Sequence, residues 1–258
     1  MSWAALLLAG LLAATPPGAA QAQVGVPGCA DDVAVRATRE LVSFESRGVP
    51  IRAHLYTPRG EANGGAIVLL HGGTGFEMNS ILFDAHAIQL ASRGYQVLLP
   101  AYFDAARPDT RRRTVNARAW RQAALDAAAE LSRRSGVEPG RVALWGYSRG
   151  AGVAAAAATA PGSGVRAAIL AAGGGAVDGE SQADRDLSVL MLHARRDEAV
   201  PVRATLRLAD ELREAGAAVE VQALDFDGHQ YDLPTWCEVF RRTRRFLESS
   251  PEGAHGPA

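Results

Sequence analysis

Residues 141–150 read Arg-Val-Ala-Leu-Trp-Gly-Tyr-Ser-Arg-Gly. The apolar first half predicts a buried strand, the Gly-Tyr-Ser-Arg-Gly that follows predicts a sharp turn, and the Ala-rich residues 151–160 predict a helix. Such a turn lifts the serine hydroxyl above the carboxyl edge of a sheet, while Gly146 and Gly150 keep side chains out of the strand-helix crossing. An inert Gly-rich turn can show the same pattern, but its position between strand and helix favours Ser148 as a nucleophile.

Length and composition favour one α/β domain. The chain has 258 residues, of which 48% are hydrophobic, and a formal net charge of −1. This near balance, with no extended basic face, argues against a nucleic-acid partner and favours a small neutral or weakly charged one. No cluster has metal-ligand spacing and no Gly-rich phosphate loop carries a Lys, so we expect neither metal nor cofactor. Nothing in the sequence indicates the oligomeric state.

The N-terminus predicts export. Residues 1–22 contain an apolar run, residues 3–14, that is too short to span a bilayer, followed by Ala-Gln-Ala at 20–22. The small-x-small end is typical of a signal-peptidase site, so we expect a cleaved signal peptide, a periplasmic or secreted protein and no membrane span. The mature chain would then form a single domain over residues 23–249 and a disordered tail over residues 250–258.

The expected export favours a disulfide between the two cysteines, because exported proteins fold in oxidising compartments. Cys29 lies near the mature N-terminus and Cys237 in a predicted C-terminal helix. A bridge would connect the two ends of the domain. A free buried thiol at Cys237 and a lipid attached to Cys29 are the alternatives.

Strand and helix patterns alternate along the chain. Strands are expected at residues 40–47, 50–57, 66–70, 95–102, 142–145, 165–171, 188–193 and 219–226. Helices are expected at residues 79–93, 117–135, 151–160, 202–215 and 233–247. Asn79 is the expected cap of the first helix, and the first two strands read as edge strands. This alternation predicts a mostly parallel sheet of about eight strands with helices on both faces.

An acid and a histidine follow two of the later strands. Asp197 lies just past one strand and His229 just past the last, so both emerge at the same sheet edge as Ser148. The order Ser, acid, His is expected for α/β-hydrolases. His229 would take the proton from Ser148, and Asp197 would fix the imidazole tautomer. Glu198 is the rival acid, and we interpret the other histidines as structural.

A second glycine-rich loop, residues 71–76, follows the central apolar strand. Its backbone N–H groups, from Gly73 or alternatively Thr74, would form an oxyanion hole together with the N–H of Arg149, although a purely structural turn is the alternative. The Arg149 side chain either enters the pocket and favours an acidic substrate, or it faces inward or across to a neighbouring helix. The candidates for substrate contact are Thr74, Phe103 and Tyr147.

Several of these motifs together resemble the dienelactone hydrolase family of α/β-hydrolases, over about residues 40–248. They are His71-Gly72-Gly73, residues 95–104, Gly146-Tyr147-Ser148-Arg149-Gly150, residues 193–201 and Gly228-His229. The resemblance implies a compact fold with no large lid domain, acting on esters or lactones without a cofactor. The enzymes that name the family carry Cys where this chain has Ser148, and they are typically cytoplasmic.

These observations predict a serine carboxylic-ester or lactone hydrolase that works through an acyl-enzyme on Ser148. Its partner would be a small-molecule ester or lactone. The alternatives are a small serine peptidase or acyltransferase on the same triad, or a catalytically silent binding protein with the hydrolase fold.

Overall fold

The computed structural model describes residues 28–106, 113–177 and 186–249. The predicted signal peptide and tail lie outside these ranges. Within them, eight strands form one sheet in the order β1-β2-β4-β3-β5-β6-β7-β8. The strands are β1 Ala37–Ser46, β2 Val49–Pro58, β3 Gly64–Leu70, β4 Gln96–Pro100, β5 Val137–Tyr147, β6 Ala167–Ala171, β7 Ser188–Arg196 and β8 Ala218–Asp227.

The sheet is mostly parallel, as the sequence predicts. The β1-β2 and β2-β4 pairs are antiparallel, and every pair from β4 to β8 is parallel. All residues of β3, β4 and β6 are buried, as expected for parallel strands covered on both faces. In β5, Leu144 packs into the core on one face and Trp145 into the core on the other.

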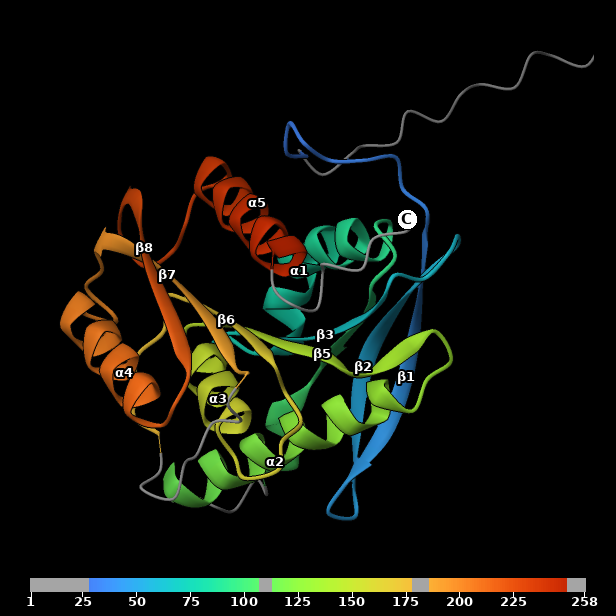
Figure 1. Ribbon diagram of the computed structural model, residues 1–258, viewed down its shortest axis with the longest axis horizontal. Helices are drawn as coiled ribbons and strands as arrows, with labels where there is room; N and C mark the ends of the chain where they lie inside the picture. Colours follow the sequence, from blue (N-terminus) through green and yellow to red (C-terminus); the bar gives the residue numbers. More distant parts are fainter. Residues whose placement is uncertain (1–27, 107–112, 178–185, 250–258) are drawn as a thin grey trace, which may run out of the picture.

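Helices cover both faces of the sheet (Figure 1). They are α1 Phe76–Ala91, η1 Tyr102–Ala105 (a 3₁₀ turn), α2 Arg113–Ser132, α3 Arg149–Ala158, α4 Val202–Glu214 and α5 Leu233–Ser249. Residues of α2, α3 and α4 share one core, and residues of α1 and α5 share the other. In the described part of the chain no separate lid domain is inserted, and no helix is both long and apolar enough to cross a bilayer.

Three local expectations are wrong. Residues 50–57 were expected at an edge, but β2 lies inside the sheet because its second side pairs with β4. The first helix begins at Phe76 after Gly75, whose φ is 92°, so Asn79 does not cap it. The central strand expected at residues 142–145 begins at Val137, because Val137 pairs with Gly64 of β3 across a bulge.

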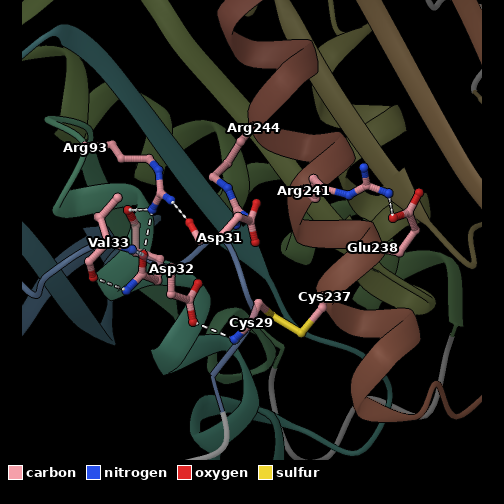
Figure 2. A network of polar contacts seen from close by, with 10 residues as sticks. Cys29, Asp31, Asp32, Val33, Arg93, Cys237, Glu238, Arg241 and Arg244 are labelled. Carbon is pink, nitrogen blue, oxygen red and sulfur yellow. Dashed lines mark hydrogen bonds and ion pairs between the residues drawn. A yellow bond between two sulfur atoms is a disulfide. The ribbon is translucent and has the colours of Figure 1, made fainter.

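The described N-terminal segment is joined to α5 and to α1 (Figure 2). Cys29 forms a disulfide with Cys237, which settles the pairing that the sequence left open. Asp31 forms an ion pair with Arg244 of α5, and its carbonyl accepts a hydrogen bond from Arg93, just after α1. The segment therefore connects the helices that cover one face of the sheet.

Candidate active site

Ser148 occupies a strained turn between β5 and α3. Its φ is 54°, a left-handed value that is uncommon for a non-glycine residue, and its N–H donates to Ala171 O at 2.8 Å. A Cβ on Gly146 would lie 2.3 Å from Gly150 O, and a Cβ on Gly150 would lie 2.2 Å from Leu70 O. Only glycine fits at either position, so the two residues allow the close crossing that exposes the hydroxyl.

Asp197 follows β7 with its side chain fully buried. Its Oδ1 accepts the N–H groups of Ala199 at 2.9 Å and Val200 at 2.7 Å. These bonds fix the carboxylate and leave Oδ2 for a third partner. Glu198, the rival acid, is exposed.

His229 bridges the acid and the serine. Its Nδ1 lies 2.7 Å from Asp197 Oδ2, and its Nε2 lies 2.9 Å from Ser148 Oγ. Because a carboxylate only accepts, Nδ1 carries the proton and Nε2 offers a lone pair to the serine hydroxyl. The structure thus brings together the three residues that the sequence order predicts.

Tyr147 lies behind His229. It is buried, its hydroxyl donates to His229 O at 2.6 Å, and the two rings stack with centroids 5.4 Å apart. Burial raises the pKa of Tyr147, so the hydroxyl stays a donor. The sequence names Tyr147 as a substrate contact, whereas these contacts support the histidine.

His193 supports the loop that carries Asp197. Its Nε2 donates to Val200 O at 2.9 Å, and its Nδ1 lies 2.8 Å from Thr205 Oγ1. Val200 therefore bonds Asp197 through its N–H and His193 through its carbonyl. Burial lowers the pKa of His193. Nothing in the sequence distinguishes this role from that of any other histidine within a strand.

The glycine loop after β3 lies against the turn at Ser148. A hydrogen bond from Gly75 N–H to Gly72 O, 3.2 Å long, closes a turn within the loop. Because Gly150 has no side chain, the backbone of α3 lies next to Leu70 and His71. In the described part of the chain neither Gly73 N–H nor Arg149 N–H has an acceptor. Arg149 is the first residue of α3, where helical N–H groups are free to bind an anion.

His71 anchors this loop from within the core. It is buried, and its ring stacks on Tyr102 with centroids 4.3 Å apart. The Tyr102 hydroxyl donates to His71 O at 2.7 Å. Burial lowers the pKa of His71 to about 4, so the ring is neutral near pH 7.

Of the other two substrate candidates, Thr74 belongs to this loop and Phe103 lies beside it. Thr74 is exposed, and Phe103 of η1 is half-buried with its ring edge against His71, centroids 4.7 Å apart. Phe103 also contacts Trp120 of α2, centroids 4.7 Å apart. No sequence pattern singles out Trp120, because it is a lone aromatic residue in an Ala-rich helix.

An open cleft of about 650 Å³ lies beside His229, where the loops after β7 and β8 meet. Its lining residues are Arg196, Glu198, Ala199, Phe226, Asp227, Gly228, His229 and Gln230. The described residues contain no group of three His, Cys, Asp or Glu side chains able to bind a metal ion.

Comparisons with known proteins agree with this architecture. A model described as the dienelactone hydrolase family matches residues 51–232. A comparison with curated protein sequences finds no match.

Among solved structures, a dienelactone hydrolase-like promiscuous phosphotriesterase from metagenomic libraries is 19% identical, with 83% of this chain and 99% of that chain covered and a TM-score of 0.68. An esterase of Pyrobaculum calidifontis is also 19% identical, with 85% and 86% covered and a TM-score of 0.65. An acylaminoacyl peptidase of Pyrococcus horikoshii is 15% identical, with 86% and 43% covered and a TM-score of 0.64, so this chain spans less than half of that peptidase. At these identities the likeness shows the shared fold.

Proposed function

The chain belongs to the dienelactone hydrolase family, and we propose that within this family it is a serine esterase or lactonase that acts through an acyl-enzyme on Ser148. Family membership makes it a hydrolase of the esterase and peptidase type acting on a small molecule. The observation that carries the finer proposal is the continuous hydrogen-bond chain from Ser148 Oγ through His229 to Asp197, with lengths of 2.9 and 2.7 Å.

The first half of the reaction forms the acyl-enzyme. His229 Nε2 takes the hydroxyl proton while Ser148 Oγ attacks the carbonyl carbon, and Asp197 stabilises the imidazolium that results. The N–H groups of Gly73 and Arg149 bind the oxygen that becomes negative. His229 then gives its proton to the alcohol oxygen as the bond from carbon to that oxygen breaks.

The second half uses water in place of the serine. His229 deprotonates the water as it attacks the acyl carbon, and then returns the proton to Ser148 Oγ as the carboxylic acid leaves. Because His229 protonates the leaving alcohol, we assign the alcohol to the open cleft beside His229. A lactone follows the same steps with its alcohol still tethered.

Export belongs to the same proposal. The disulfide between Cys29 and Cys237 supports it, because such bonds persist in oxidising compartments outside the cytoplasm.

Ser148→Ala tests the proposed nucleophile. We expect kcat on p-nitrophenyl acetate to fall by about 10⁴-fold or more, because the residual rate comes from the rest of the site alone. Ser132→Ala on the exposed side of α2 is the control and should keep the rate of the unchanged protein. A folded Ser148→Ala protein that hydrolyses the ester as fast as the control would refute the proposal.

A further inference from the structure

The Arg149 side chain lies over two adjacent aromatic rings next to the nucleophile. Its Cζ is 5.7 Å from the ring centroid of Phe103 and 5.7 Å from that of Trp120. A Cβ on Gly73 would lie 3.6 Å from the same atom. The guanidinium therefore contacts η1, α2 and the glycine loop, and these contacts restrict it more than a freely solvated arginine.

Among the residues that the structure describes, no side chain is paired with this charge. Arg149 is exposed, and in the part of the chain that the structure describes it forms neither a hydrogen bond nor an ion pair. Glu77 of α1 and Asp104 of η1 are paired with Arg52 instead. Aromatic faces leave the five guanidinium N–H donors unused, so the fork remains available to an anion.

The sheet order places Arg149 on the acyl side of the site. β3 and its glycine loop lie on one side of β5, whereas β7 and β8, which carry Asp197 and His229, lie on the other. The leaving alcohol belongs on the His229 side because His229 protonates it. The acyl group is thus directed toward the glycine loop, Phe103 and Arg149.

We infer that Arg149 is a specificity-determining residue that binds a negative charge on the acyl group, so that half-esters of dicarboxylic acids are the preferred substrates. This inference rests on the proposed function. The Arg149 side chain packs on Trp120 of the neighbouring helix α2, one of the orientations that the sequence left open, and it remains exposed. A guanidinium binds a carboxylate through two parallel N–H···O bonds, which a neutral acyl chain cannot accept.

The test compares two esters that differ only in acyl charge. They are the mono-p-nitrophenyl ester of glutaric acid and the same compound with its free carboxylate methylated. We expect kcat/KM to be about tenfold higher for the anionic ester, a modest factor because the guanidinium is exposed. The preference should shrink as salt is raised, because salt screens exposed charges.

Arg149→Gln retains the backbone N–H assigned to the oxyanion hole and should lower the ratio of kcat/KM for the anionic ester to that for the neutral ester about tenfold, mainly through KM for the anionic ester. Arg149→Lys should retain part of the preference, because it keeps the charge without the planar fork. The control is Arg207→Gln on the exposed face of α4, which should behave like the unchanged protein. Thermal melting of each variant checks that it folds.

Three outcomes would overturn the inference alone while ester hydrolysis persists. They are equal kcat/KM for the two esters in the unchanged protein, a preference that survives in Arg149→Gln, and an equal fall for both esters in Arg149→Gln. The last would make Arg149 a residue that positions the glycine loop. Absence of Ser148-dependent hydrolysis of either ester would overturn the proposed function and this inference together.

Discussion

Gly150 is the residue at which the fold and the site depend most directly on one another. A Cβ at this position would lie 2.2 Å from Leu70 O and 2.6 Å from His71 O, so the loop after β3 and the start of α3 can approach only if residue 150 has no side chain. The proposed oxyanion hole, formed by the N–H groups of Gly73 and Arg149, depends on this same approach.

We expect Gly150→Ala to lower the free energy of unfolding by about 3 kcal/mol or more, because the backbone must move to remove the overlap. The rate of ester hydrolysis should fall even in the fraction of protein that remains folded, since the glycine loop would be displaced. Gly60→Ala is the matched control, because a Cβ there meets nothing within 4 Å, and it should change stability by less than about 1 kcal/mol. Urea unfolding and ester hydrolysis measure both effects. Indistinguishable unfolding midpoints for the two variants would contradict the packing described for this crossing.

At the scale of elements, β3 and η1 meet through His71. Its ring stacks on Tyr102, its Nδ1 donates to Gly72 O at 2.9 Å, and burial lowers its pKa to about 4. The unfolded chain would take up a proton near pH 6.5, whereas the folded state takes it up only near pH 4. The contribution of neutral His71 to the free energy of unfolding is therefore fully present above pH 6.5 and is lost as the pH falls toward 4.

Between pH 7 and pH 5 this linkage predicts a loss of about 2 kcal/mol in the free energy of unfolding from His71. Burial also lowers the pKa values of His54, His86 and His193, which adds to the loss in the same direction. His71→Gln cannot titrate, so it should lose about 2 kcal/mol less over the same interval. Urea titrations at the two pH values provide the comparison, and parallel losses in the two proteins would refute the assignment.

At the scale of the whole molecule, the Cys29–Cys237 disulfide closes nearly the entire chain, with a sequence separation of 208 residues. A loop of this length restricts the unfolded chain strongly, by at most about 5 kcal/mol in the entropic account. The ion pair between Asp31 and Arg244 lies in the same contact (Figure 2).

Cys29→Ser with Cys237→Ser should therefore lower the unfolding midpoint in urea and leave kcat on simple esters nearly unchanged below that midpoint. A reducing agent should reproduce the shift in the unchanged protein and have no effect on the double variant. Equal midpoints for oxidised and reduced protein would show that the bridge contributes nothing to stability.

Local patterns in the sequence predicted much of this architecture. The continuous apolar runs of β3 and β6 identified covered strands, and the order of Ser148, Asp197 and His229 identified residues that do meet. The sequence did not predict the interior position of β2. Alternating apolar and polar residues indicate that one face of a strand is buried, but they do not indicate whether both of its edges pair with other strands.

The surroundings of single side chains were harder to predict. Arg149 lies over the adjacent rings of Phe103 and Trp120, which come from η1 and α2, so its orientation depends on three elements at once. The role of Tyr147 was equally hard to predict, because its hydroxyl donates to the carbonyl of His229, 82 residues further along the chain. The sequence left the pairing of Cys29 and Cys237 undecided for the same reason, since a disulfide depends on how closely the two ends of the domain approach.

Peptide mass spectrometry of protein quenched during turnover of a p-nitrophenyl ester tests the central claim most directly. The account predicts an acyl adduct on the peptide that contains Ser148, absent from Ser148→Ala and strongly reduced in His229→Ala. An acyl group found on a different residue, or rapid hydrolysis that leaves Ser148 unmodified at every time point, would contradict it.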